Sequence, residues 1–211
     1  FGWDIADVCY DNSELTGAHT GYPDITARIA ADTFRMLPYE ANTAAFLVDF
    51  YEATGSPNRP GKPHPACPRN LLKGVIARAE AAGYRARFGS EFEFWIFQES
   101  PETLREKNFD KLTPLTPGMY GYSWLRTGQQ RALVHEVLDT MEAFDIDVEG
   151  LHTETGPGVY EVAIRHAEAL AAADMAALFK TTMKEVASRH GLTVSFMAKW
   201  NEDLPGSSGH I

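Results

Sequence analysis

The sequence predicts an α+β fold built on a mainly antiparallel sheet. Its composition, with 44% hydrophobic and 23% charged residues, is that of an ordinary globular protein. After residue 68, stretches with helical spacing of apolar residues alternate with stretches typical of strands, in the order helix, strand, helix, strand, strand, helix, strand. The two consecutive strands are separated only by a short turn rich in glycine and proline, which predicts an antiparallel pair.

Residues 1 to about 60 are expected to be largely irregular. Gly-Tyr-Pro-Asp at 21–24 and Pro38 interrupt the short apolar stretches of this segment, and residues 46–48 have the pattern of a short strand. Between residues 55 and 65 lie four prolines and two glycines, which indicate a loop or linker. We therefore expect a domain boundary near residue 60.

The next helix and strand have clear patterns. Apolar side chains from Leu71 to Ala79 follow helical spacing, and Gly83 can end that helix in a left-handed conformation. The segment 85–97 is rich in aromatic residues and alternates as a strand does. A polar loop is expected after it because prolines recur there, at Pro101, Pro114 and Pro117.

The remaining elements are two helices and three strands. The second of these helices is rich in alanine and is stopped by Gly191. The first two strands surround the turn Thr155-Gly-Pro-Gly158. The expected bounds are a helix at 129–144, two strands within 148–164, a helix at 168–190 and a strand at 193–199.

Composition and motifs argue against several classes of protein. The formal net charge of −10 leaves no surplus of Lys and Arg to neutralise phosphates, so nucleic-acid binding is not expected. Cys9 and Cys67 are the only cysteines and show no C-x-x-C spacing, so neither a disulfide scaffold nor a thiolate zinc site is expected. The sequence has no nucleophile elbow, P-loop or dinucleotide fingerprint.

The location and extent of the protein are also expectations from the sequence. No apolar run approaches the length of a membrane helix, and no signal segment opens the chain, so a cytoplasmic location is expected. The chain begins at Phe1 and stops at Gly209-His210-Ile211. We therefore expect a fragment of a longer protein.

The segment 89–97 carries the sharpest local signal. Because side chains alternate along a strand, Glu91 and Glu93 share one face, while Phe92 and Phe94 share the other, which we expect in the core. Two carboxylates about 7 Å apart would repel one another on a dry face. Their oxygens suit a hard cation such as Mg²⁺. A sheet with one solvated face is the alternative explanation.

A second acidic group surrounds the turn at 155–158. If Glu154 and Glu161 flank this turn, the paired strands can aim both carboxylates at one point, and the glycines let the backbone approach a ligand closely. Glu149 and His152 lie just upstream. A hairpin with polar side chains explains the same pattern without a ligand.

A Gly/Ser loop at 205–210 forms a third feature. It ends in His210, whose imidazole could bind a metal ion or a phosphate. Lys199 precedes the loop and could bring a positive charge to the same region. An ordinary polar loop and a solvated lysine explain these residues equally well.

Taken together and in this order, these segments resemble the glutamine synthetase family. The likeness lies in the strand Gly-x-Glu-x-Glu-Phe, the Glu–turn–Glu hairpin and the strand Phe196-Met-Ala-Lys199 before a Gly/Ser-His loop. Ala187-Ser-Arg-His-Gly191, Gly-Tyr-Pro-Asp and Asp32-Thr33 extend it over nearly the whole chain. The resemblance implies part of a small β-grasp-like domain at 1–60 and the amino-terminal portion of the catalytic domain at 61–211.

The resemblance also implies an activity. Members of the family are ATP-dependent ligases that phosphorylate the side-chain carboxylate of glutamate and let ammonia displace the phosphate. Two divalent ions, Mg²⁺ or Mn²⁺, neutralise the charge that develops during phosphoryl transfer. The family further implies a homo-oligomeric ring with active sites between subunits, and partners that are neither nucleic acid nor membrane.

Metal ligands follow from the resemblance position by position. It places Glu93, Glu154 and Glu161 on the first ion, and Glu91 and His210 on the second. The remaining ligand of the second ion would lie beyond the end of this chain. Four carboxylates and a histidine on two cations would also relieve the repulsion between the paired glutamates.

Three further residues receive roles from the same resemblance. Glu149 matches the acidic residue that contacts the nucleotide, and Gly206 matches the glycine whose backbone contacts glutamate. Near the amino terminus, Asp4 matches the catalytic aspartate that helps to deprotonate ammonium.

Two positions depart from the family pattern. Val159 stands where Gln is common, and Pro205 replaces Asn in a loop that reads Pro-Gly-Ser-Ser-Gly-His instead of Asn-Gly-Ser-Gly-Met-His. Loss of the Asn contact to glutamate suggests a different second substrate, so a γ-glutamyl–polyamine or γ-glutamyl–ethanolamine ligase is the alternative function. A homologue kept as a non-catalytic binding module is a further alternative.

Overall fold

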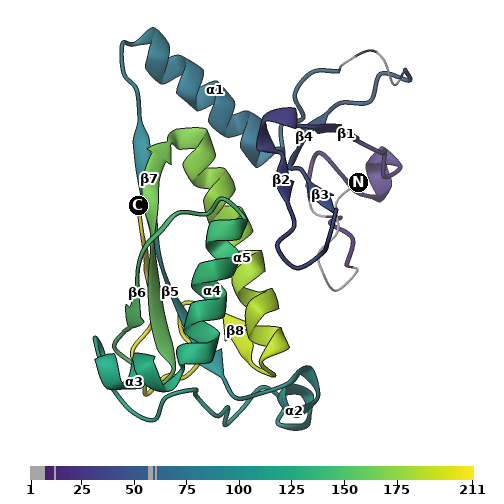
Figure 1. Ribbon diagram of the computed structural model, residues 1–211. Coiled ribbons are helices and arrows are strands. Elements are labelled where there is room, and N and C mark those ends of the chain that lie inside the picture. The colour runs from purple at the N-terminus through teal and green to yellow at the C-terminus, as the bar shows by residue number, and fades with distance from the viewer. Residues whose placement is uncertain (1–7, 12, 57–58, 60) are drawn as a thin grey trace. The chain divides into compact units, whose positions relative to one another are not determined.

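The computed structural model describes residues 8–11, 13–56, 59 and 61–211 (Figure 1). The chain forms two compact units, one made of Phe1–Phe34 with Ala44–Arg85 and the other of Arg35–Thr43 with Ala86–Ile211. The predicted domains, including the β-grasp-like character of the first, stay a prediction.

The first unit is built from short strands and one long helix. Strand β1 (Thr26–Ile29) pairs antiparallel with β4 (Val48–Tyr51). Helix α1 (Pro68–Ala81) begins after Cys67, whose sulfur accepts a hydrogen bond from the backbone N–H of Asn70. The shorter elements are the 3₁₀ turns Ala18–Thr20 and Ala31–Thr33 and strand β3 (Ala44–Ala45); β2 (Arg35–Met36) belongs to the second unit.

The short strand expected at 46–48 is shifted along the chain. The backbone N–H of Leu47 donates to Oγ1 of Thr33 at 2.8 Å and so takes no part in a strand ladder. Strand β4 therefore begins only at Val48. A side-chain acceptor from a distant turn of the chain is invisible in the local apolar pattern.

A buried carboxylate ties α1 to β4. Asp49 lies 2.9 Å from Arg69 and 2.5 Å from Lys73. Burial alone raises the pKa of the Asp49 carboxyl, but hydrogen bonds and ion pairs with these two cations outweigh burial and lower the pKa. The helix ends before Gly83, whose φ of +86° agrees with the predicted left-handed stop.

The second unit contains a five-stranded sheet whose paired strands are all antiparallel. The order is β6-β7-β5-β8, and β9 lies on the same side of β5 as β8. Residues 196–208 therefore form a long loop between β8 and β9, which both pair with the same edge of β5. The predicted α+β fold with a mainly antiparallel sheet is confirmed. The strands are β5 (Arg87–Phe97), β6 (Val148–Thr153), β7 (Val159–Glu168), β8 (Thr193–Ser195) and β9 (Gly209–His210).

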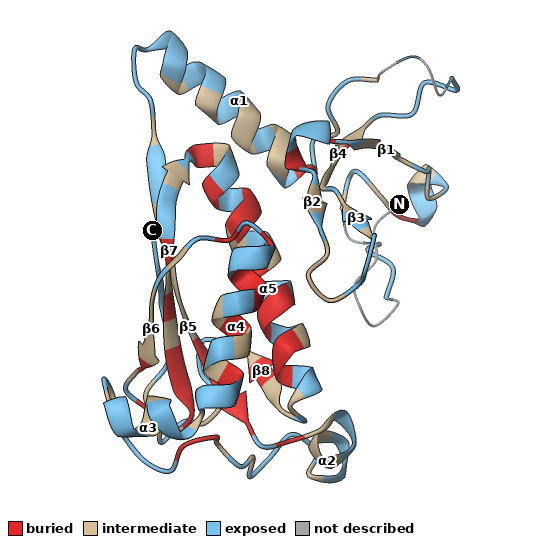
Figure 2. Ribbon diagram, viewed as in Figure 1, coloured by how far each residue is buried: buried red, intermediate tan, exposed pale blue. Residues whose placement is uncertain are grey.

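Two helices cover one face of this sheet. Helices α4 (Arg131–Ala143) and α5 (Ala169–Arg189) lie over it in Figure 1, and buried residues concentrate on α5 and β7 in Figure 2. The ring of Phe179 on α5 stacks on Phe92 with centroids 5.5 Å apart and meets Phe94 edge-on at 6.0 Å. The predicted aromatic face of β5 is thus the face that packs on the helices.

Two short helices occupy the segment predicted as a polar loop, so that prediction was wrong. Helix α2 (Pro101–Glu106) follows Ser100, which forms a capping box with Thr103. Helix α3 (Trp124–Gln129) follows Ser123, whose side chain accepts a hydrogen bond from a backbone N–H of the first turn. Each helix has only 6 residues, too few to show an apolar period.

The last long strand is also shorter than predicted at 193–199. Strand β8 stops at Ser195. The backbone C=O of Met197 accepts a hydrogen bond from the indole Nε1–H of Trp95 at 3.0 Å. This side-chain bond holds the backbone outside the sheet, so the long loop begins four residues earlier than the pattern indicates.

The second face of the sheet becomes apolar toward the end of β5. Trp95 and Phe97 follow the two glutamates on that face and are only 0% and 1% exposed. They form a buried cluster with Val159, against which Leu112 and Trp200 pack. Val159 therefore has a packing role in this cluster.

Gly158, in the turn between β6 and β7, gives a stability prediction. Its φ is +72°, and a Cβ would lie 2.5 Å from the C=O oxygen of Ile96 and 3.1 Å from the N of Leu115. Gly158→Ala is expected to cost about 2–4 kcal/mol through left-handed strain and overpacking. The control Gly191→Ala, at φ +68° with no atom within 4 Å, should cost about 1 kcal/mol. Urea unfolding measures both, and equal losses would contradict the tight packing of the turn.

Candidate metal centre

Acidic side chains from neighbouring strands line up on one face of the sheet. In the register, Glu93 of β5 lies opposite Glu161 of β7, and Glu161 lies opposite His152 of β6. Glu91 lies opposite His210 of β9. Directly paired residues share a face, and the alternate side chains of β5 face α5. Five side chains therefore lie on the face that the helices leave open, and we call them the acidic row: Glu91, Glu93, His152, Glu161 and His210.

The loop before β9 holds the carboxylate of Glu93. The backbone N–H of Ser208 donates to Oε2 of Glu93 at 2.9 Å, and the hydroxyl donates to Oε1 at 2.6 Å. The same hydroxyl lies 3.3 Å from Nε2 of His210, whose Nδ1 is 3.1 Å from Oε2 of Glu91. The sequence did not single out Ser208, because one hydroxyl in a Gly/Ser loop has no distinguishing pattern.

Glu154 lies at the end of the β6–β7 hairpin and meets an aromatic residue from a distant loop. Its Oε2 accepts a hydrogen bond from the backbone N–H of Thr155 at 2.5 Å. A hydrogen bond to Glu154 and the negative charge of that carboxylate raise the pKa of the Tyr122 hydroxyl. The ring of Tyr122 stacks on His152 with centroids 4.7 Å apart. Tyr122 thus connects the hairpin to the acidic row.

Tyr122 is a candidate functional residue that the sequence analysis missed. Its φ of +54° is left-handed, which is uncommon for an aromatic residue. Its N–H donates to the C=O of Thr153 at 2.6 Å, and the N–H of Ser123 donates to Oγ1 of Thr153 at 2.9 Å. A sequence signal is Gly121, where a Cβ would lie 3.3 Å from Oε2 of Glu154. Only the folded chain gives that glycine its meaning.

Glu161 is the most clearly perturbed carboxylate of the group. Its side chain is 13% exposed, and Nε2 of His152 lies 3.8 Å from its Oε1. Burial raises the pKa of the Glu161 carboxyl; His152 opposes this effect, and the charges of Glu91, Glu93 and Glu154 add to it. The fold therefore concentrates negative charge that a divalent cation would neutralise.

Two of the predicted site residues, Glu149 and Gly206, lie apart from this group, and a third is not described. Glu149 is exposed at the start of β6, and its Oε1 is 3.5 Å from Nε of Arg165. Gly206 lies in the loop before β9, where a Cβ would come 2.9 Å from the C=O oxygen of Ala198, so packing alone favours glycine there. Asp4 lies outside the described residues.

The arrangement of the side chains is not that of a closed metal site. Within residues 8–11, 13–56, 59 and 61–211, no group of three or more His, Cys, Asp or Glu side chains is placed to hold an ion. The carboxylates of Glu93 and Glu154 are bonded to the protein instead. The donor set nevertheless fits a hard divalent cation, because carboxylate oxygens dominate it. Cβ atoms of cross-strand pairs are about 4.5–5.5 Å apart, so side-chain rotation alone can bring Glu93 and Glu161 onto one ion.

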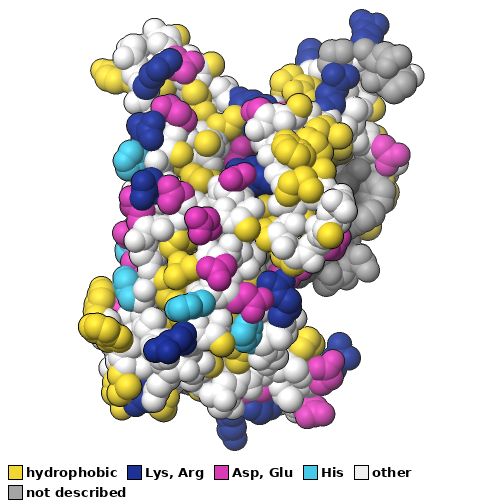
Figure 3. Space-filling model, in the orientation of Figure 1, with side chains coloured by type: hydrophobic (Ala, Val, Ile, Leu, Met, Phe, Trp, Pro, Cys, Tyr) yellow, Lys and Arg dark blue, Asp and Glu magenta, His cyan; other side chains and the backbone are white. Residues whose placement is uncertain are grey.

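A hollow adjoins the acidic row at the edge strand β6. His152 belongs to both, Tyr122 stacks on it, and helices α3 and α4 supply much of the remaining wall. Figure 3 shows hydrophobic side chains gathered at the surface over α3, where Trp124 is 91% exposed. The lining is Tyr122, Ser123, Trp124, Thr127, Gly128, Arg131, Val134, His135, Leu151 and His152.

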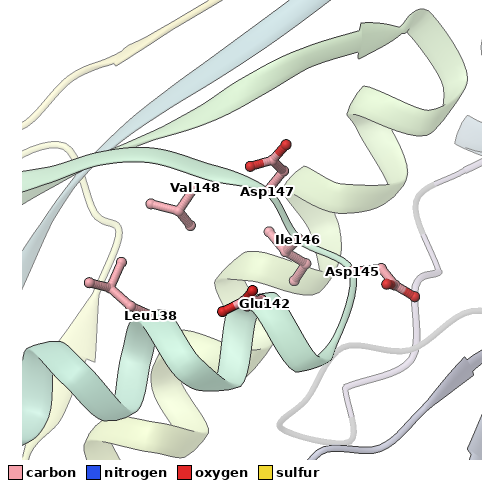
Figure 4. A pocket seen from close by; sticks show the side chains of 6 residues that line it. All are labelled: Leu138, Glu142, Asp145, Ile146, Asp147 and Val148. Carbon is pink, nitrogen blue, oxygen red and sulfur yellow. The ribbon is translucent and has the colours of Figure 1, made fainter.

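A separate hollow lies at the carboxyl end of α4. Figure 4 shows its lining, in which Glu142, Asp145 and Asp147 supply carboxylates and Leu138, Ile146 and Val148 supply apolar side chains. Asp147 is paired with Arg165 at 3.0 Å. None of the predicted site residues lines this hollow, so we assign it no part in the candidate centre.

The sheet, its covering helices and the open acidic face define an α+β domain with a row of carboxylates on one face of the sheet. The comparison with known families makes this specific. Residues 65–211, more than half of the chain, match the family described as "Glutamine synthetase, catalytic domain". The chain belongs to the glutamine synthetase family.

Curated relatives include several kinds of ligase. Type-1 glutamine synthetase 2 of Dictyostelium discoideum is 47% identical over 211 residues, which cover 100% of this chain and 39% of that protein. A glutamate–isopropylamine ligase of a Pseudomonas species is 36% identical, covering 100% and 45%. The gamma-glutamylethanolamide synthetase GlnA4 of Streptomyces coelicolor is 35% identical, covering 95% and 42%. The chain thus spans less than half the length of these relatives.

Solved structures share the fold. A GmaS/ADP complex superposes with a TM-score of 0.74 at 26% identity, covering 93% of this chain and 41% of that chain. GmaS without ligand gives the same TM-score, covering 89% and 42%. The antiparallel sheet with its flanking helices is therefore the fold of glutamine synthetase-like proteins.

Proposed function

We propose that this chain is part of an ATP-dependent ligase that forms glutamine from glutamate and ammonia through a γ-glutamyl phosphate. Family membership supports a carbon–nitrogen ligase, and the 47% identity to a type-1 glutamine synthetase favours ammonia as the second substrate. The observation that carries the proposal is the paired register of Glu93 and Glu161 beside Glu91 and His210 on one open face.

In this proposal the acidic row holds two divalent ions, Mg²⁺ or Mn²⁺. Glu93, Glu154 and Glu161 bind the first ion, and Glu91 and His210 bind the second. The ions, when bound, neutralise charge on the phosphates of ATP. The raised pKa of the Glu161 carboxyl supports this role, because a cation would offset the charge that raises it.

The remaining predicted residues have roles around the ions. Glu149 contacts the nucleotide, Gly206 contacts glutamate through its backbone, and Asp4 helps to deprotonate ammonium. Tyr122, whose hydroxyl has its pKa raised by Glu154 and whose ring stacks on His152, would help to orient these side chains. The whole protein would form a homo-oligomeric ring with its active sites between subunits.

A γ-glutamyl–amine ligase is the second candidate function. Two relatives are named for isopropylamine and for ethanolamide products. The hollow beside the acidic row, which Tyr122 and His152 help to line, would give room for the alkyl part of such an amine. Pro205, in place of Asn, also favours this alternative. A non-catalytic binding module is the third candidate.

Location and pathway follow from the proposed activity. No helix in the described part of the chain is long and apolar enough to cross a membrane. Formation of glutamine in the cytoplasm, as a step of nitrogen metabolism, stays a prediction.

A product assay on the full-length protein decides among these functions. With Mg²⁺, ATP and glutamate, we expect kcat/KM for ammonia to exceed that for isopropylamine, ethanolamine or putrescine by about tenfold or more. Omission of ATP is the control and should abolish product. A preference for one of the amines would favour the second candidate. Metal and nucleotide binding without product from any acceptor would favour the third.

A further inference from the structure

Ser208 joins residues that belong to the two proposed ion sites. Its backbone N–H and hydroxyl bind the two carboxylate oxygens of Glu93 at 2.9 and 2.6 Å, and the hydroxyl also lies 3.3 Å from His210. His210 in turn contacts Glu91 at 3.1 Å. We infer that Ser208 is a positioning residue of the metal centre, whose hydroxyl orients Glu93 and His210 for two divalent cations.

The two hydrogen bonds from Ser208 leave the carboxylate of Glu93 able to bind an ion. Each carboxylate oxygen has two lone pairs, so one hydrogen bond from Ser208 leaves a lone pair for a cation. Two bonds from one residue fix both the position and the plane of the carboxylate. Partners of this kind orient metal ligands, and their loss typically weakens metal binding about 10–100-fold.

Backbone hydrogen bonds hold Ser208 next to Glu93. The N–H of Glu93 donates to the C=O of Ser208 at 3.0 Å, so the residue before β9 is bonded to β5 in both directions. Strand β9 then places His210 directly opposite Glu91. The strand register therefore places the backbone of Ser208 beside Glu93, and its hydroxyl reaches both Glu93 and His210.

The hydroxyl has little part in folding. Ser208 is exposed, so removal of its hydroxyl leaves no cavity in the core. In the loop pattern that this segment resembles, glycine stands at the position of Ser208. The backbone thus accepts a residue without a hydroxyl, and the effect of removing it can be measured on a folded chain.

Titration of Mn²⁺ tests this inference, which rests on the proposed metal centre. Calorimetry on the full-length protein should show about 10–100-fold weaker binding to Ser208→Ala than to the parent, and binding restored by Ser208→Thr. Electron paramagnetic resonance of bound Mn²⁺ should show a changed coordination environment in Ser208→Ala alone. The matched control is Ser207→Ala, whose lost hydroxyl donates to the C=O of Met197 at 2.8 Å. It should bind like the parent.

The outcomes separate this inference from the proposed function. If the parent binds Mn²⁺ and Glu93→Ala does not, the metal centre stands. Equal affinity and identical spectra for Ser208→Ala and Ser207→Ala would then overturn the role of Ser208 alone. If the full-length protein does not bind Mn²⁺, the metal centre fails and the positioning role fails with it.

Discussion

Glu161→Gln is expected to weaken Mn²⁺ binding by the full-length protein about 100-fold or more, since losing a ligand costs more than losing the partner of a ligand. The variant should nevertheless be more stable than the parent at pH 7. Burial raises the pKa of the Glu161 carboxyl, so its charged form destabilises the fold. Stability linked to a raised carboxyl pKa is present below the unfolded-state pKa and is lost as pH rises through the folded-state pKa. A glutamine side chain does not ionise, so Glu161→Gln avoids this loss of stability at pH 7.

Calorimetric Mn²⁺ titration and urea unfolding at pH 7 check both parts of this result. The matched control is Glu168→Gln, on the same strand, where the carboxylate is exposed and lies 3.0 Å from Arg87. It should leave Mn²⁺ binding unchanged. Loss of binding in both variants would indicate a general charge effect, and loss in neither would remove Glu161 from the metal centre.

Glu99→Ala is expected to destabilise the second unit by about 3 kcal/mol at pH 7. The Glu99 side chain is 1% exposed and pairs with Lys107. It also accepts hydrogen bonds from the hydroxyl of Thr103 and the N–H of Thr113, both at 2.7 Å. Alanine would leave the N–H of Thr113 without this acceptor. Urea unfolding measures the loss, with exposed Glu102→Ala as control, for which a much smaller change is expected.

The same pair of variants gives a pH dependence of known sign. Burial alone raises the pKa of the Glu99 carboxyl, but the bonds from Lys107, Thr103 and Thr113 outweigh burial and lower the pKa to about 2. A lowered carboxyl pKa contributes stability above the unfolded-state value of 4.5, and that stability is lost as pH falls toward about 2. The difference in free energy of unfolding between the parent and Glu99→Ala should therefore become smaller as the pH is lowered. A difference in free energy of unfolding that becomes larger in acid would contradict the lowered pKa of Glu99.

Long elements were predictable because their apolar period repeats several times. The helix expected at 168–190 is α5, Ala169–Arg189, and the strand expected at 85–97 is β5, Arg87–Phe97. The alternation along β5 also placed Glu91 and Glu93 on the face away from the helix-packed aromatic rings. A pattern of this kind is local, so the sequence contains it in full.

Short elements and loop contacts were not predictable in this way. Helices α2 and α3 depend on single serine caps, and β8 ends where the indole of Trp95 takes the C=O of Met197. Val159 looked like a substrate residue in the sequence but is buried beside Trp95 and Phe97. Each of these outcomes depends on a contact between segments far apart along the chain.

The sequence by itself determined the fold class, the long elements and the acidic residues on β5 and around the hairpin. Only the tertiary structure decided which of these residues meet: Glu93 with Glu161 and Ser208, and Tyr122 with Glu154. The physical reason is that periodicity records which face a residue takes, whereas strand register and loop closure decide which faces come together. The candidate metal centre is a product of that second step.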